Sequence, residues 1–86
     1  MKKLFALRDV KTSCFGVPFG CQYEQEAVRH FDAAVNYGKD IVAQYPQDFD
    51  LYEIGTFDER TGVVVGLSEP ELVVNGAVLK KKEVSE

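Results

Sequence analysis

The sequence has few residues that bind transition metals, because its 86 residues include only two cysteines and one histidine. A structural zinc site requires four ligands at fixed spacing. Cys14, Cys21 and His30 form neither a CxxC nor an HxxxH pair. The sequence therefore predicts no metal site and no cofactor. In the reducing compartment that we expect for this protein, both cysteines remain thiols.

Catalytic motifs are also missing. The glycines match neither a P-loop nor a GxGxxG phosphate cradle. Nucleophilic catalysis would require His30 to meet Cys14, Cys21 or Ser13 in space, and no local motif favours that meeting. The acidic residues between positions 48 and 59 fit a turn and the start of a strand better than paired catalytic carboxylates. We therefore expect a non-enzymatic protein without catalytic residues.

Positive charge is scarce, since 10 Lys and Arg face 14 Asp and Glu, which gives a net charge of −4. Proteins that neutralise nucleic-acid phosphates usually have a basic surplus, so this balance argues against a nucleic-acid coat protein. Two local basic clusters are exceptions. One lies at residues 80–82, and the other, near the N-terminus, consists of Lys2, Lys3, Arg8 and Lys11.

Long hydrophobic runs are absent. No run approaches the ~20 apolar residues that span a bilayer. The short apolar run at residues 4–7 is followed at once by Arg8 and Asp9, which does not suit a signal peptide. We therefore expect a cytosolic protein that does not associate with membranes.

The composition, with 45% apolar and 28% charged residues, is that of an ordinary globular protein. We expect one compact domain over residues 1–79 and a solvated tail over residues 80–86. A chain this short buries only roughly 60–65% of its unfolded surface, which leaves its stability dependent on good packing or on a partner. A homodimer is therefore expected.

The N-terminal third of the chain predicts a strand and then an apolar loop. Residues 2–11 alternate in a strand pattern with apolar groups on both faces, which favours a central position in a sheet. Residues 12–22 contain Gly16, Pro18 and Gly20 and are predicted to form a loop. Its apolar side chains either fold back to cap the core or bind a partner. These candidate partner-binding residues are Phe15, Val17 and Phe19.

The middle of the chain predicts helices. Residues 23–37 place apolar side chains on one face and polar side chains on the other, as in an amphipathic helix. Gly38 is placed to end this helix in a left-handed conformation. A second, shorter helix is expected from Asp40, a possible N-cap, to the stop at Pro46.

The C-terminal part predicts strands and turns. Residues 50–57 form a strand, residues 58–62 a turn with Gly62 at positive φ, and residues 63–65 the returning strand. An Asn75-Gly76 pair between two apolar triplets then predicts a further hairpin.

Together these elements predict an α+β fold. Its small mixed or antiparallel sheet has three to five strands, in the order β-α-α-β-β plus a C-terminal hairpin, and packs on one main amphipathic helix. One helix covers only one face of the sheet. The second face is then covered by the apolar loop, by the C-terminal hairpin or by another copy of the chain.

The strand aromatics allow an alternative function. Phe5, Tyr52 and Phe57 could form a platform on which single-stranded bases stack, with the N-terminal basic cluster on the phosphates. Core packing is the preferred interpretation of these rings, because so small a chain has few residues to fill its interior.

Two segments resemble the nonstructural proteins of gokushoviruses, single-stranded DNA bacteriophages of the Microviridae. They are LFALRDVKTSCFGVPF at residues 4–19 and DFDLYEIGTFD at residues 48–58, followed by Thr61-Gly62. Residues 27–34 also fit the pattern between them. The resemblance implies a helper of phage single-stranded DNA replication or genome packaging in the host bacterial cytoplasm. Its expected partners are phage replication or capsid-assembly proteins, with single-stranded DNA as the alternative ligand.

Overall fold

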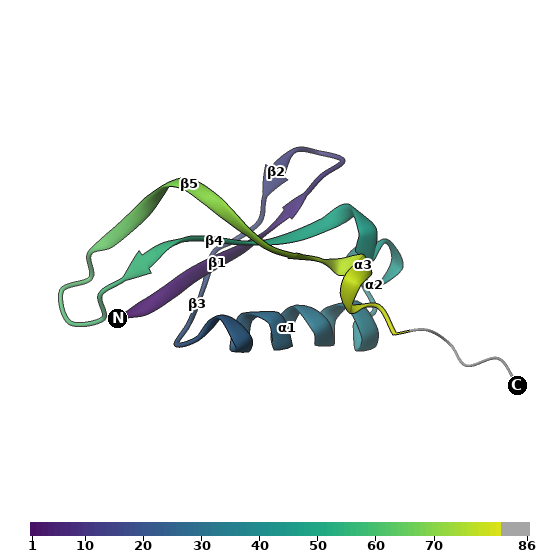
Figure 1. Ribbon diagram of the computed structural model, residues 1–86, viewed down its shortest axis with the longest axis horizontal. Helices are drawn as coiled ribbons and strands as arrows, with labels where there is room; N and C mark the ends of the chain where they lie inside the picture. Colours follow the sequence, from purple (N-terminus) through teal and green to yellow (C-terminus); the bar gives the residue numbers. More distant parts are fainter. Residues whose placement is uncertain (82–86) are drawn as a thin grey trace, which may run out of the picture.

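The structure, a computed structural model, describes residues 1–81 of the chain. As predicted, it is an α+β fold in which an antiparallel sheet packs on one main helix (Figure 1). The elements in chain order are β1 (Lys2–Asp9), β2 (Cys14–Phe15), β3 (Phe19–Cys21), α1 (Glu24–Tyr37), α2 (Ile41–Gln44), the 3-10 helix η1 (Pro46–Asp48), β4 (Phe49–Phe57), β5 (Val64–Asn75) and α3 (Gly76–Leu79).

Strand β1 is the centre of the sheet. The strand order is β2-β1-β4-β5, and β3 also pairs with β1. One edge of β1 is therefore bonded to β4 along its whole length, while β3 and β2 share the other edge, at its N-terminal and C-terminal ends. This confirms the central position that its two apolar faces predicted.

The loop predicted over residues 12–22 was wrong in part, because this segment contains the two short strands β2 and β3. The chain turns back along β1, so that Phe15 pairs with Arg8 and Phe19 pairs with Phe5. Pro18, which cannot donate a hydrogen bond to a strand ladder, lies in the gap between the two strands. Gly16 and Pro18 therefore separate two short edge strands, and they do not prevent strand formation on either side.

The core lies between α1 and the sheet. Ala27, Phe31 and Val35, spaced one helical turn apart, are buried on α1 and pack against Phe5 and Leu51 from the central strands. Burying a side chain of this size contributes roughly 1.5–3 kcal/mol. The predicted amphipathic helix is thus confirmed.

The N-terminus of α1 is capped by a side chain, and its C-terminus differs from the prediction. The Glu26 carboxylate accepts a hydrogen bond from the Tyr23 backbone N–H at 3.0 Å, which fixes the N-terminus. At the other end Gly38 has φ −75°, so the left-handed conformation predicted for it was wrong. A side chain is excluded there because a Cβ atom would lie 2.5 Å from the carbonyl oxygen of Ala34.

The turn and short helix between the main elements form as expected. Asp40 caps α2, since its carboxylate accepts a hydrogen bond from the Val42 N–H at 3.1 Å. Gly62 takes φ +76° in the turn before β5. Strand β5 extends to Asn75, well beyond the predicted residues 63–65. Residues 67–70 bulge out opposite Ile54, and pairing with β4 resumes at Glu71.

The C-terminal hairpin predicted at Asn75-Gly76 was wrong. Strand β5 runs through to Asn75, and Gly76 begins the helix α3. The Asn75 side chain caps this helix by accepting a hydrogen bond from the Ala77 N–H at 2.8 Å. Its amide nitrogen donates to the Asp50 carboxylate at 2.7 Å and to the Gln47 carbonyl at 3.0 Å. These bonds hold Asn75 at the junction of β5 and α3.

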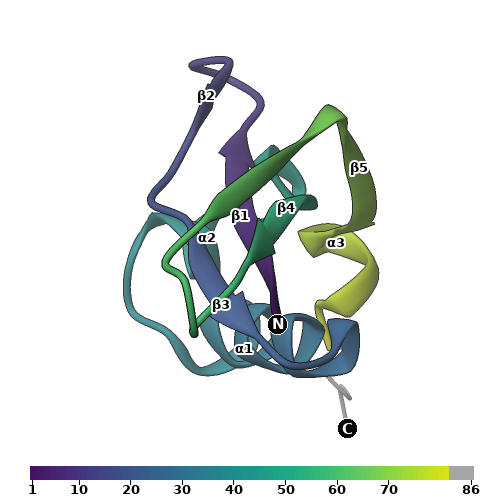
Figure 2. The ribbon, with the colours of Figure 1, turned by 90° about the vertical axis from the view of Figure 1, so that its left-hand side faces the viewer.

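The second face of the sheet is covered in part by the N-terminal segment. The β2 hairpin lies on the side of the sheet opposite α1 in both ribbon views (Figures 1 and 2). The short helix α3 lies instead beside α1, where Asn36 donates to the Leu79 carbonyl at 2.9 Å. Of the predicted solvated tail, residues 82–86 lie outside the described residues, and Lys80 and Lys81 are exposed.

We predict that Gly76→Ala destabilises the fold. A Cβ atom at Gly76 would overlap the Pro46 carbonyl oxygen and lie 3.1 Å from the ring of Phe31. Overpacking of this kind costs about 1–3 kcal/mol, which urea denaturation would measure as a lower free energy of unfolding. Gly16→Ala is the matched control, because its added Cβ would meet only the Leu7 carbonyl oxygen, at 3.5 Å. Equal stabilities of the two variants would contradict the packing described for α3.

Candidate functional site

The face of the sheet opposite α1, hereafter the open face, carries the clearest candidate binding surface. Leu4, Ala6 and Arg8 alternate with the core residues of β1 and therefore lie on this face. Cross-strand partners share a face, which adds side chains from β2, β4 and β5. The open face is thus defined by Leu4, Ala6 and Arg8 of β1, Phe15 of β2, Asp50 and Tyr52 of β4 and Leu72 of β5.

An aromatic pair lies at the centre of the open face. The rings of Phe15 and Tyr52 meet edge to face with their centroids 5.3 Å apart. The guanidinium carbon of Arg8 lies 6.0 Å from the centroid of Phe15. Ala6, which is paired with Tyr52, is fully buried although no helix of residues 1–81 covers this face. An edge-to-face pair contributes about 0.5–1.5 kcal/mol beyond its area, so Phe15 anchors β2 to the sheet.

The open face nevertheless leaves large apolar groups in contact with solvent. Phe15 is 43% exposed and Leu72 is 59% exposed. Single exposed apolar residues are ordinary, but several on one sheet face form a patch of the kind that binding partners cover.

The three predicted partner-binding residues do not form one surface. Phe15 lies on the open face, and Val17 lies in the connection between β2 and β3, where it is 87% exposed. Phe19 lies on the other side, packed against the core with its ring 6.2 Å from that of Phe5. Phe15 pairs with Arg8 and Phe19 pairs with Phe5, and these two β1 residues lie on opposite faces of the sheet, so the two rings point in opposite directions.

The predicted basic cluster is also divided. Lys2 and Arg8 lie on the open-face side of β1, whereas Lys3 lies on the other side and forms an ion pair with Glu53 at 3.6 Å. Lys11 is exposed in the turn between β1 and β2. Asp50, the cross-strand partner of Arg8, adds a negative charge to the same face of the sheet, which weakens the positive potential there.

The strand aromatics divide between core and surface. Phe5 is fully buried in the core and cannot stack on a base, while Tyr52 and Phe57 are half-buried. The ring that joins Tyr52 on the open face is Phe15, which the sequence placed in a loop.

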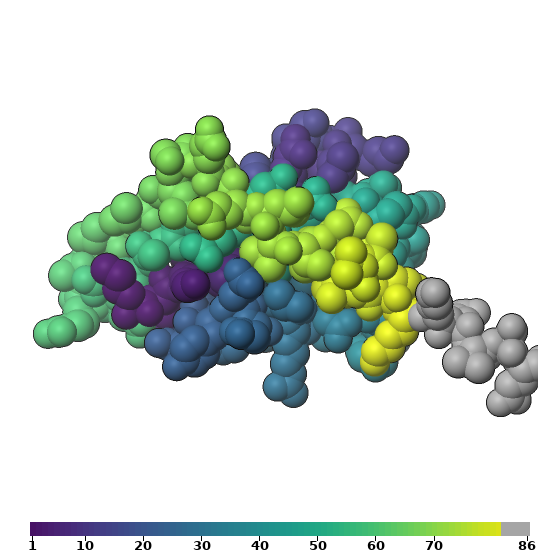
Figure 3. Space-filling view, viewed as in Figure 1, coloured from purple at the N-terminus to yellow at the C-terminus, as the bar shows by residue number. Residues whose placement is uncertain are grey.

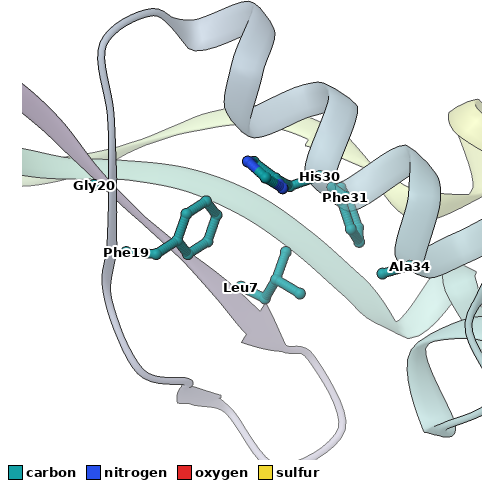
Figure 4. A pocket seen from close by; sticks show the side chains of 6 residues that line it. All are labelled: Leu7, Phe19, Gly20, His30, Phe31 and Ala34. Carbon is teal, nitrogen blue, oxygen red and sulfur yellow. The ribbon is translucent and has the colours of Figure 1, made fainter.

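A second feature is an apolar pocket of about 330 Å³ between α1 and the sheet (Figure 4). Leu7 and Phe19 point into it from the strands, and His30 and Phe31 point into it from the helix. The His30 ring meets Phe19 edge to face, 6.4 Å between centroids. Within residues 1–81 no group of three or more potential metal ligands occurs.

The two cysteines have different surroundings. Cys14 is exposed, whereas Cys21 is buried in the core cluster. Burial raises the pKa of the Cys21 thiol, and the nearby carboxylate of Glu26 raises it further, against a smaller opposing effect of Lys2. Both thiols are free.

The outer edge of β5 is a surface that the sequence interpretation missed. Strand β5 is the last strand of the sheet, and its N-terminal half protrudes from the body of the molecule (Figure 3). Val63, Val64 and Val65 are 54%, 61% and 56% exposed. Three adjacent valines are read most simply as a buried strand, so no sequence signal marked them as an edge.

A family model described as Phage ORF5 protein matches residues 2–79, which are nearly the whole chain and all of its sheet. The chain belongs to the Phage ORF5 protein family. No curated protein and no solved structure matches it. In this family member, no helix within residues 1–81 is long and apolar enough to cross a membrane.

We predict that the thiols react at very different rates with Ellman's reagent at pH 8. Cys14 reacts fast because it is exposed, whereas Cys21 reacts slowly because it is buried and its raised pKa lowers the thiolate fraction. Cys14→Ser should remove the fast phase and leave the slow one. Two equally fast phases in the native protein would contradict the burial of Cys21.

Proposed function

We propose that this phage protein is a non-enzymatic accessory protein that binds other phage proteins in the host cytoplasm. Its membership of the Phage ORF5 protein family supports a role in a phage. The resemblance of residues 4–19 and 48–58 to gokushovirus nonstructural proteins supports the narrower role of helping single-stranded DNA replication or genome packaging. Its partners are then the replication or capsid-assembly proteins of the same phage.

The observation that carries this proposal is the apolar surface of the open face. Phe15 and Leu72 are both more than two-fifths exposed on a sheet face that α1 does not cover. Aromatic and aliphatic side chains in such a patch are typical anchors of a protein interface. The net charge of −4 also favours a protein partner over a phosphate backbone.

We predict that the double variant Phe15→Ser, Leu72→Ser weakens binding to the partner at least tenfold. Removing two apolar anchors typically costs more than ~1.4 kcal/mol, which corresponds to a factor of ten in Kd. Calorimetric titration of purified replication and capsid-assembly proteins of the phage would measure the loss. Thermal unfolding of the variant is recorded in parallel, because Phe15 also packs on Tyr52.

Ile41→Ser is the matched control. Ile41 is also an exposed apolar residue, at 55%, but it lies on α2 and away from the open face. Its binding should equal that of the unmodified chain. A folded double variant that binds as tightly as this control would contradict the proposal, as would an unmodified chain that binds none of these phage proteins.

A second candidate function, single-stranded DNA binding, is favoured by one specific arrangement. Arg8 lies over Phe15, and Phe15 packs on Tyr52, so a cation and two rings meet on an accessible sheet face. Base stacking on aromatic side chains and salt-dependent phosphate contacts are the usual basis of such binding. The overall negative charge opposes it, as does the negative charge of Asp50, the cross-strand partner of Arg8.

Fluorescence anisotropy with a labelled oligonucleotide at two salt concentrations separates the two functions. Our proposal predicts flat traces at micromolar protein. Micromolar affinity that falls with added salt, and that is lost in Arg8→Ala, would establish the second function in its place.

A further inference from the structure

We propose that two copies of this chain associate through the outer edge of β5, so that their sheets join into one continuous antiparallel sheet. This self-association is separate from the proposed binding of phage proteins, because a strand edge and a sheet face are different surfaces.

The free backbone groups of β5 can be assigned from its bonds to β4. The Val63 carbonyl accepts a hydrogen bond from the Asp58 N–H at 2.9 Å and therefore points toward β4. The Val65 carbonyl also points toward β4, since a Cβ atom at Gly55 would overlap it. Backbone direction alternates along a strand, so Val64 and Gly66 direct their N–H and C=O groups outward.

The N-terminal half of this edge lacks the features that keep natural strand edges apart. Charged side chains, proline and bulges are the usual protection. In β5 they occur together at residues 68–71, where Glu69, Pro70 and Glu71 follow one another. Residues 62–68 contain no charged residue, and their three valines are more than half exposed. The unprotected stretch is therefore short and confined to the N-terminal half of the strand.

A second copy of the chain fits this edge better than an unrelated strand, because antiparallel pairing of identical segments has two-fold symmetry. If the axis passes beside Val65, then Val64 of one copy lies opposite Gly66 of the other. These two positions are the ones that direct backbone groups outward, so each pair exchanges two hydrogen bonds. Val63 then lies opposite Leu67 of the second copy, and Val65 lies opposite itself, which gives apolar cross-strand pairs throughout.

Charge does not oppose pairing along this stretch. Two chains of net charge −4 repel each other, so they can meet only where the local charge is low or complementary. The paired stretch is uncharged.

The proposed interface is small, which favours a weak dimer. Pairing over residues 63–67 buries much less than the roughly 1,600 Å² of a standard interface, so we expect a dimer with Kd in the micromolar range.

Sedimentation velocity over about 1 to 300 µM protein tests the association by mass action. We expect a reversible shift from monomer to dimer for the full chain. Val65→Lys should raise the dimer Kd at least tenfold, because it places two ammonium groups opposite each other on the two-fold axis. Val17→Lys, which adds the same charge at an exposed valine away from the edge, should dimerise like the unmodified chain.

A cysteine at the axis tests the register independently. In a Cys14→Ser background, Val65→Cys places two thiols at a close, non-hydrogen-bonded pair, and oxidation with diamide should give a covalent dimer. Val17→Cys in the same background is the control and should cross-link far more slowly. A chain that stays monomeric over the whole concentration range, or a Val65→Lys variant that still dimerises, would overturn the proposal. Normal binding of phage proteins by monomeric Val65→Lys would leave the function of the open face intact.

Discussion

The packing of α1 against the centre of the sheet is the interaction on which the rest of the structure depends. Phe31 and Val35 of the helix meet Phe5 and Leu51 of the two central strands, and all four are essentially excluded from solvent. Strand β1 is paired on both edges, so the helix covers the most completely bonded part of the sheet. A chain this small has no second layer with which to build another core.

This constraint determines which surfaces remain for binding. The helix α1 covers one face of the sheet, and on the opposite face Phe15 packs on Tyr52 beside the buried Ala6. The two edges of the sheet also differ in how well they are protected from pairing with another strand. On the side of β1, two short strands cap the edge, whereas on the side of β5 protection is confined to the bulge at residues 67–70. The open face and the outer edge of β5 therefore have the same cause: so short a chain has too few helices and strands to cover every face and edge of its sheet.

Much of the fold could be predicted from local patterns. The periodicity of residues 23–37, the N-cap at Asp40 and the turn at Gly62 each depend on neighbouring residues, and each matches the structure. Predictions failed where distant contacts decide the outcome. Asn75-Gly76 has the sequence of a hairpin turn, but the Asn75 side chain bonds to Gln47 and Asp50, far away in the chain.

The candidate surfaces were less accessible to sequence reasoning. Phe15 and Phe19 could be recognised as exceptional, but their opposite directions follow from the pairing of both short strands with β1. The exposed edge at Val63 to Val65 could not be inferred either, because only the strand order shows that nothing in residues 1–81 pairs with its outer side. Residue type indicates burial on average, whereas topology decides it for a given strand.

Native-state hydrogen exchange of the β1 amides tests the central claim most directly. If β1 is the doubly paired strand beneath α1, the amides of Phe5 and Ala6, which face the partner residues Phe19 and Tyr52, should exchange only through global unfolding. Their exchange free energies should then equal the free energy of unfolding from urea denaturation and fall with urea at the same slope. Exchange of these amides through local opening, at free energies well below the global value and independent of urea, would contradict the account.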